Sequence, residues 1–312
     1  MKPTRRIAVK PAAGAPRERT NRWLNAFTRN GKAWMIVLPS VLLFYFIMWR
    51  PIAEGVFLSF FKLENYQAAG FVGFQNYREV LSDTLFLGAL KNTFGYVFWS
   101  LLISFLPPII IAVALNEMVH LKGLFKFSIY FPVIVPTVAA ALIWYFLYLP
   151  GDGGILNMLR HSIGLKNSEW LQNPILTIPL IITSMTWRGC GTSMVLYLAA
   201  LQGVNQELYE ASTIDGAGFF LKLRYITFPH LSPIILLLLV RQIVGIFQVM
   251  VEPMTMTGGG PNNASLSLNL QGYNYAFVYF QPERALALNV ITFVILLGIT
   301  VFYFRLDKKL SI

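Results

Sequence analysis

The chain has 312 residues, of which 56% are hydrophobic and only 12% are charged. An ordinary soluble domain has about 25% charged residues, so this composition excludes that class and indicates a protein whose main solvent is lipid. The formal net charge of +11 is strongly basic, and we expect the positions of the basic residues to report membrane orientation.

The first 32 residues form a basic segment ahead of the first apolar run. They carry nine Lys or Arg residues against one acid, Glu18. The apolar continuation is too long for a cleaved signal peptide and lacks a small-residue cleavage site. A nucleic-acid-binding arm would need a soluble reading domain after it, and none follows. We therefore predict a cytoplasmic tail over residues 1–32 and no nucleic-acid partner.

Six apolar runs are long enough to cross a bilayer, which takes roughly 20 helical residues. Lipid offers no partner to an unpaired backbone group, so each run should be helical. An N-inside orientation places 16 of the 25 basic residues in the cytoplasm and six outside. We predict an all-α membrane protein with six transmembrane helices, both termini cytoplasmic, a transmembrane bundle over residues 33–304 and a short tail over 305–312. The runs are residues 33–51, 93–115, 124–149, 175–199, 232–251 and 285–304.

Several prolines lie inside the predicted helices: Pro39, Pro107, Pro108, Pro132 and Pro136. A proline removes a backbone hydrogen bond and kinks a helix. Two interpretations stay open, irregular packing of the bundle and helices that bend to open and close a pathway.

The fourth run carries a polar cluster made of Ser184, Trp187, Arg188, Gly191 and Thr192. A tryptophan beside polar groups can stack on the apolar face of a sugar ring, so Trp187 and Arg188 are candidate pathway residues. The alternative is close helix packing around the small residues of the cluster and the neighbouring Gly189. The single cysteine of the chain, Cys190, excludes an intramolecular disulfide and is expected to be a small apolar packing residue.

Between the fourth and fifth runs, residues 205–233 form a polar, helix-prone insert. Asn205 can cap a helix that runs to Ala211, with Glu207 in the first turn where the helix dipole favours an acid. Gly216 should break this helix. A second short helix is predicted from Phe219, ended by Pro229 and Pro233. The unit is either a rigid knob for a partner's groove or a solvated amphipathic loop.

Polar residues continue at helical spacing in the fifth run, where Arg241, Gly245, Gln248 and Glu252 should share one face. An arginine inside a membrane costs about 2.5 to 3.5 kcal/mol on insertion scales, so it faces protein or water. Arg241, Gln248 and Glu252 are candidate pathway residues, and an anchor between helices is the alternative for Arg241. If Arg188 and Arg241 both line the pathway, acidic sugars such as uronate oligomers would be favoured.

The insert carries a specific resemblance. Tyr209-Glu210-Ala211-Ser212, then Asp215-Gly216-Ala217 and later Phe228-Pro229, resemble the EAA loop of ABC importer permeases, with Ser212 in place of an alanine and Phe228 in place of a leucine. The resemblance extends to the sugar-permease branch of that family through residues 71–77, 153–157, 198–203 and 257–261.

The resemblance implies the type I importer fold of maltose-permease-like subunits in a bacterial inner membrane. Tyr209, Glu210, Ala211, Ser212, Asp215, Gly216 and Ala217 would couple the chain to two cytoplasmic ATPase subunits, which would bind ATP and Mg²⁺, so no cofactor is expected on this chain. The remaining implied partners are a second permease subunit, an extracytoplasmic solute-binding protein and an oligosaccharide or polysaccharide fragment.

The sequence leaves three rival functions to consider. An intramembrane serine protease would need Ser193 to meet His230, which lies at the cytoplasmic end of the fifth run, so we expect neither catalytic residues nor a metal site. A stand-alone secondary carrier suits prolines and buried charges, but it would need no EAA-like loop and would normally show inverted repeats, which are not evident. An ABC permease for another solute is the third alternative.

Overall fold

The computed structural model describes residues 31–310. The predicted N-terminal tail therefore lies almost entirely outside the described residues. The chain divides into two compact units, Met1–Glu54 and Gly55–Ile312, which are described separately.

The first unit consists of a helix at the position of the first predicted run. Helix α2 (Gly31–Phe44) passes through a π-helical turn, η1 (Tyr45–Trp49), into α3 (Arg50–Leu58). The stretch Trp34–Leu58 is long and apolar enough to span a membrane. Pro39 lies inside α2 without ending it. The only charged pair of this stretch among the described residues joins Arg50 Nε to Glu54 Oε1 at 2.7 Å, one helical turn apart.

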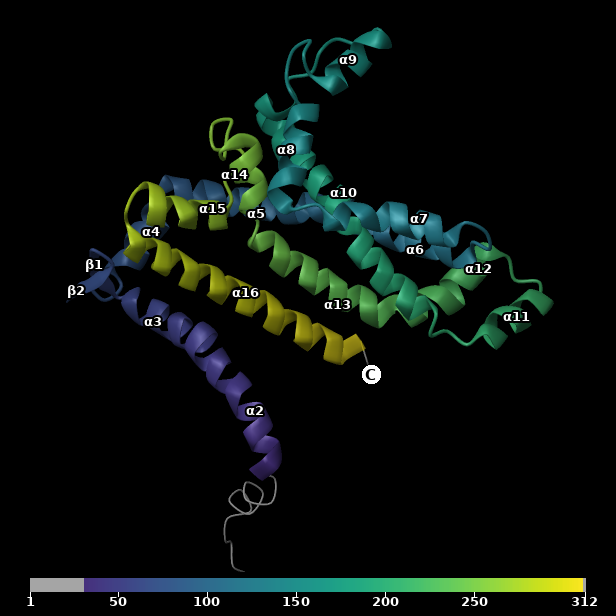
Figure 1. The fold of residues 1–312 in the computed structure, drawn as a ribbon, viewed down its shortest axis with the longest axis horizontal. Helices are drawn as coiled ribbons and strands as arrows, with labels where there is room; N and C mark the ends of the chain where they lie inside the picture. Colours follow the sequence, from purple (N-terminus) through teal and green to yellow (C-terminus); the bar gives the residue numbers. More distant parts are fainter. Residues whose placement is uncertain (1–30, 311–312) are drawn as a thin grey trace, which may run out of the picture. The chain divides into compact units, whose positions relative to one another are not determined.

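The second unit begins with the last turn of α3, which is followed by a feature that the sequence analysis did not predict, a β-hairpin (Figure 1). Strands β1 (Phe61–Glu64) and β2 (Gln67–Phe71) pair antiparallel around a two-residue turn. Asn65 and Tyr66 in the turn both have positive φ, the conformation that matches the twist of the flanking strands. The prediction of an all-α protein is therefore wrong in this detail, although helices make up most of the chain.

The other elements of this unit are helical, and helices also occupy much of the sequence between the predicted apolar runs. Residues 62–92, for example, contain the hairpin, α4 and the start of α5. The elements are α4 (Gln75–Ser82), α5 (Thr84–Ile103), α6 (Leu106–Glu117), α7 (Lys122–Tyr130), η2 (Phe131–Ile134), α8 (Thr137–Leu147), α9 (Ile155–Ser162), η3 (Trp170–Gln172), α10 (Pro174–Leu201), α11 (Gln206–Ile214), α12 (Phe219–Lys222), η4 (Leu223–Thr227), α13 (Phe228–Phe247), α14 (Val251–Thr257), α15 (Leu268–Tyr273), η5 (Asn274–Val278) and α16 (Pro282–Leu310).

Within residues 31–310, four helical stretches are long and apolar enough to cross a membrane, or five if one bent pair counts as a single span. They are Trp34–Leu58, Thr84–Glu117, Phe219–Phe247 and Pro282–Arg305. The fourth predicted run coincides with α10, a continuous helix of 28 residues, which is not among the four. Its middle turns carry the polar cluster around Arg188, and these residues lower the hydropathy of any window that contains them.

Prolines shape the path of two predicted spans. The bent pair consists of Lys122–Ile134 and Thr137–Leu147, which meet at 99°. Pro132 lies in η2 and Pro136 directly precedes α8, so the predicted run 124–149 is not a straight helix. Pro107 and Pro108 lie in the first turn of α6, where the missing N–H costs little.

Helix α10 is the central element of the bundle. It packs against α5, α6, α8 and α13. Ile181 and Ile182 belong to one buried cluster with Tyr96, and Met194 and Tyr197 belong to another. Because these side chains are fully or almost fully buried, α10 holds a fixed position from which its polar residues are presented to the neighbouring helices.

Candidate functional site

The insert forms a helix-turn-helix unit, made of α11 and α12, at the end of the second unit opposite the β-hairpin (Figure 1). The side-chain oxygen of Asn205 accepts a hydrogen bond from the backbone N–H of Glu207 at 3.0 Å. The predicted helix cap is therefore confirmed. The helix continues to Ile214, three residues past the predicted end.

A rigid glycine turn ends α11. Gly216 has φ +75°, which a residue with a Cβ adopts only at a cost. The N–H of Gly216 donates to the carbonyl of Thr213 at 3.1 Å, and the N–H of Ala217 donates to the carbonyl of Ser212 at 2.8 Å. This pair of bonds is the Schellman arrangement, which satisfies the last carbonyls of a helix and fixes the direction of the chain.

The second limb begins at Phe219, as predicted, but it does not end at the prolines. Helix α12 continues through the π-helical turn η4 into α13, and the stretch Phe219–Phe247 is continuous. Pro229 lies in the first turn of α13. The wider π-helical turn before it changes the hydrogen-bond pattern where proline supplies no N–H, so the helix passes the proline. The second limb is therefore the start of a helix that is long and apolar enough to cross a membrane.

Side chains join the two limbs. The hydroxyls of Tyr209 and Thr227 lie 2.9 Å apart, and Lys222 Nζ donates to Thr213 Oγ1 at 2.7 Å. The hydroxyl of Ser212 donates to the carbonyl of Tyr209 at 2.7 Å. Of the predicted coupling residues, Tyr209 and Ser212 thus have their hydroxyls committed within the unit.

The opposite face of the unit is exposed. Glu210, Ala211 and Asp215 are exposed, and no cation among the described residues forms an ion pair with Glu210. Two large apolar side chains of the unit are exposed as well, Ile214 at 88% and Phe220 at 79%. The α11–α12 unit is held rigid by its internal hydrogen bonds, and it presents an unpaired carboxylate beside exposed apolar side chains. This combination is typical of a protein docking surface.

A second feature is an open cavity of about 370 Å³ in the bundle, lined by residues of α6, η2, α10 and α13 and by Ser104 after α5. Arg188 of α10 and Arg241 of α13 both line it. The structure thus brings together two predicted pathway residues that are 53 positions apart. Trp187 does not line the cavity, because its ring packs against Trp144 at 6.1 Å between centroids.

The cavity contains polar residues that the sequence analysis did not single out. Gln242 lines it and donates from Nε2 to the carbonyl of Ser100 at 2.8 Å. Ser104 and Thr186 line it with hydroxyls 2.6 Å apart. Cys190, expected to pack as an apolar residue, is half-buried and also lines the cavity. Gln242 directly follows the candidate residue Arg241, and this position was the one sign in the sequence that it could line the cavity.

The predicted polar stripe of the fifth run is broken. Helix α13 ends at Phe247, and Glu252 lies in the separate helix α14, so Gln248 and Glu252 do not continue the face of Arg241. Pro253 lacks the N–H that would bond the carbonyl of Val249 in a continuing helix, and Ser267 Oγ donates to that carbonyl at 2.6 Å instead. The single-face prediction is therefore wrong.

Glu252 nevertheless stays close to the cavity. It is buried, and its Oε1 lies 3.8 Å from Nη2 of Arg188. Arg241 is exposed and has no carboxylate within ion-pair distance among residues 31–310. The two arginines of the cavity therefore differ, since one has a partner and the other is free.

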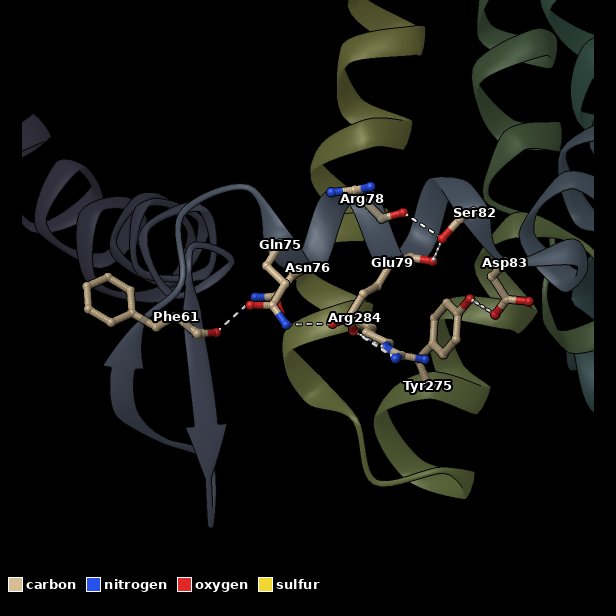
Figure 2. A network of polar contacts seen from close by, with 9 residues as sticks. All are labelled: Phe61, Gln75, Asn76, Arg78, Glu79, Ser82, Asp83, Tyr275 and Arg284. Carbon is tan, nitrogen blue, oxygen red and sulfur yellow. Dashed lines mark hydrogen bonds and ion pairs between the residues drawn. The ribbon is translucent and has the colours of Figure 1, made fainter.

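The motif at residues 71–77 has a structural role. Asn76 donates from Nδ2 to the carbonyls of Ser59 and Phe61 at 2.8 and 2.9 Å, which ties α4 to the hairpin. Figure 2 shows the neighbouring contacts, where Arg284 binds Glu79 through Nε at 2.9 Å and Nη2 at 2.7 Å. Hydrogen bonds from Gln75 and Arg284 lower the pKa of Glu79.

Tyr275 completes this network by donating to the carboxylate of Asp83 (Figure 2). Burial raises the pKa of Tyr275 to about 12, and the hydrogen bond to Asp83 acts in the same direction. The phenol therefore stays protonated at neutral pH and keeps η5 bound to the start of α5.

The motif at residues 153–157 places a buried amide in the segment between α8 and α10. Asn157 is fully buried and donates to the carbonyls of Gly151 and Ser168, both at 3.0 Å. Its Oδ1 accepts from the N–H of Ser168 at 2.9 Å and from Trp170 Nε1 at 2.7 Å. The side chain of Asn157 thus makes hydrogen bonds with four polar groups, which belong to Gly151, Ser168 and Trp170.

We expect Asn157→Ala to destabilise this loop by about 2 to 4 kcal/mol, because four hydrogen bonds are lost and buried groups are left unpaired. Limited proteolysis of residues 150–174 in the purified protein measures the change. Asn167→Ala is the matched control, since Asn167 is exposed and makes one contact, to Asp152 at 2.6 Å. Equal protease resistance of the two variants would contradict the assigned role of Asn157.

Comparison with known proteins gives a consistent result. Residues 107–312 match the family model described as binding-protein-dependent transport system inner membrane component. The chain is 27% identical to the arabinooligosaccharides transport system permease protein of Bacillus subtilis (strain 168) over 98% of both chains. It is 30% identical to a probable ABC transporter permease protein of the same organism, over 88% of this chain and 95% of the relative.

A trehalose/maltose transport system permease protein of Thermococcus litoralis is 30% identical over 76% of this chain and 80% of its own length. Among solved structures, a chain of a bacterial ABC transporter involved in the import of the acidic polysaccharide alginate has the same fold. Its TM-score is 0.83 at 24% identity, over 93% of this chain and all of that chain. The resemblance first carried by the EAA-like insert is confirmed, and the chain belongs to the family of binding-protein-dependent transport system inner membrane components.

Proposed function

We propose that the chain is a transmembrane subunit of an ATP-driven importer and forms half of the pathway for an oligosaccharide or polysaccharide fragment. The observation that carries the proposal is the braced helix-turn-helix unit with its exposed Glu210, Ile214 and Phe220. Membership of the permease family and the sugars named for its relatives support the substrate class.

The coupling surface would be the exposed face of α11, seated in a groove of a cytoplasmic ATPase. Glu210 would contact a basic or backbone donor there, and Asp215 to Ala217 would hold the turn. Because α12 is continuous with α13, a displacement of this unit would pass directly into the bundle. Closure of two ATPase subunits would then draw two permease subunits together and change the side on which the pathway is open.

The proposal includes six membrane crossings with both termini in the cytoplasm. The four apolar stretches account for four crossings, and the bent pair α7–α8 would supply a fifth. Helix α10 would supply the sixth, since 28 helical residues rise about 42 Å, more than a hydrocarbon core of about 30 Å. The distribution of Lys and Arg supports this orientation.

The partners of such an importer would be a second permease subunit, two ATPase subunits that bind ATP and Mg²⁺, and an extracytoplasmic solute-binding protein. One structural neighbour was solved in complex with an alginate pentasaccharide-bound periplasmic protein, which supports the last of these. The location would be the inner membrane of a bacterium, as a multi-pass protein.

Reconstitution tests this proposal. The chain purified alone should hydrolyse no ATP, because its sequence contains no G-x-x-x-x-G-K-[S/T] loop. Co-expression with its cognate ATPases and second permease should give a stable assembly whose ATPase activity rises with the loaded binding protein. Sugar uptake by vesicles containing this chain alone, without ATP, would contradict the proposal and indicate a secondary carrier.

A further inference from the structure

The inference concerns the charge of the cavity between α10 and α13. Two arginines, Arg188 and Arg241, line this space, and its lining contains no Asp or Glu. The other lining groups are neutral, and several can donate hydrogen bonds, among them Ser104, Thr186 and Gln242. A concave site lined by one sign of charge focuses its field on the enclosed space.

Glu252 compensates only part of this charge. Its Oε1 lies 3.8 Å from Nη2 of Arg188, and Glu252 does not line the cavity itself. It is buried, and it lines a separate narrow gap together with Thr137, Ala140, Ala141, Ser184, Met185 and Arg188. Within residues 31–310, Arg241 has no carboxylate at ion-pair distance. The cavity therefore retains one positive charge that no residue of the described chain neutralises.

The two arginines lie on two different walls of the cavity, Arg188 on α10 and Arg241 on α13. Gly189 follows Arg188 on α10, and Gly245 lies one turn beyond Arg241 on α13; both line the cavity, and neither has a neighbouring atom where a Cβ would extend. These glycines leave room beside each arginine. A planar guanidinium with free space in front of it binds carboxylates through two parallel hydrogen bonds.

We propose that this cavity selects anionic saccharides of the uronate class, with Arg241 as the specificity-determining residue that meets a substrate carboxylate and Arg188 as a second cation held in place by Glu252. The proposal rests on the proposed function, since it names the substrate class of the same pathway. A neutral sugar would leave Arg241 without a counter-charge at the cavity, whereas the carboxylate of a uronate would supply one.

The chain contains its own reporter for this charge. Cys190 is its single cysteine and lines the same cavity. In the assembled importer in lipid nanodiscs, Cys190 is treated with an anionic methanethiosulfonate, the sulfonatoethyl reagent, or with a cationic one, the trimethylammonioethyl reagent. The thiolate attacks the sulfenyl sulfur, a disulfide forms and methanesulfinate leaves, so both reagents undergo one reaction. Mass spectrometry of the peptide that contains Cys190 measures each rate.

The ratio of the two rates isolates the local field, because the thiolate fraction and the access route are the same for both reagents. Relative to a free small thiol, we expect the anionic reagent to be favoured by about tenfold. Arg241→Gln should bring the ratio of the anionic to the cationic rate close to that of the free thiol, and Arg241→Lys should preserve it. Glu252→Gln removes a negative charge beside Arg188, so it should increase the ratio. Lys166→Gln is the control of equal net charge, because Lys166 is exposed in the outer loop, and it should leave the ratio unchanged.

Substrate protection tests the class directly. Trigalacturonate should slow the modification of Cys190 at lower concentrations than maltotriose does, and Arg241→Gln should remove this preference. Equal protection by the two sugars, or a reagent ratio that equals that of the free thiol and does not change with Arg241→Gln, would overturn the proposal. The second result would mean that Arg241 pairs with an acid of the partner permease. If the assembled importer shows the expected ratio of reagent rates but no ATP-driven uptake, only the proposed function is contradicted.

Discussion

Glu210→Ala should reduce ATP-dependent uptake by at least about tenfold while the protein still inserts and assembles. Truncating one partner of a charged hydrogen bond in an interface costs about 2 to 5 kcal/mol, and 1.4 kcal/mol corresponds to a factor of ten. Because Glu210 is exposed and makes no ion pair in the described chain, its removal should not affect folding. Uptake of labelled saccharide into proteoliposomes with internal ATP measures the effect.

Glu207→Ala is the matched control for this prediction. Glu207 lies in the first turn of the same helix, where its carboxylate accepts a hydrogen bond from Asn205 at 3.1 Å. Its loss should cost about 0.3 to 1 kcal/mol of helix stability and leave uptake close to that of the parent protein. Adding Gly216→Ala to Glu210→Ala should lower uptake further, because alanine strains the turn at φ +75°. Parent-level uptake in this double variant would remove the basis of the coupling assignment.

Gly191→Ala should destabilise the bundle by about 1 to 3 kcal/mol, the usual cost of overpacking. A Cβ at Gly191 would lie 2.7 Å from the carbonyl oxygen of Ile129 and 2.8 Å from the Cα of Tyr130. These are backbone atoms of the α7–η2 region, so neither can move aside without displacing that segment. Thermal unfolding of the purified protein in detergent, followed by fluorescence, measures the loss as a lower Tm.

Gly189→Ala, two residues away on the same helix, serves as the control. No atom lies within 4 Å of the position that its Cβ would take. Exchanging glycine for alanine inside a helix is favourable by roughly 1 kcal/mol, so this variant should unfold at or above the Tm of the parent. Equal Tm values for the two variants would show that α10 does not approach α7 and η2 as closely as described.

The contrast between these glycines shows what the sequence could and could not establish. The polar cluster of the fourth run offered two interpretations, a pathway lining and close helix packing. The structure assigns both, because Gly191 lies at a backbone contact while Gly189 and Arg188 line the cavity. Spacing along one helix could not separate these roles, since they depend on which neighbour faces each turn.

Local signals predicted the helix-turn-helix unit well. The Asn205 cap and the turn at Gly216 depend on residues within one or two helical turns, and both are present as expected. Pro229 was misleading because a π-helical turn precedes it and lets the helix continue. That arrangement depends on packing along α13, which proline position alone does not reveal.

Long-range contacts account for the other errors. The end of α13 depends on Ser267, which takes the carbonyl of Val249 from 18 positions away. The β-hairpin is held by Asn76, whose amide binds the carbonyls of Ser59 and Phe61. No periodicity of hydrophobic residues encodes such contacts. A turn with two positive φ values at Asn65 and Tyr66 is likewise a weak signal in the sequence.

Cross-linking from α11 tests the central claim most directly. A photoreactive amino acid at position 214, where the parent side chain is 88% exposed, places the probe on the proposed coupling face. In the assembled importer we expect this probe to cross-link to a cytoplasmic ATPase subunit, whereas the same probe at Asn167 in the outer loop should not. An intact assembly in which position 214 forms no cross-link to an ATPase would contradict the account.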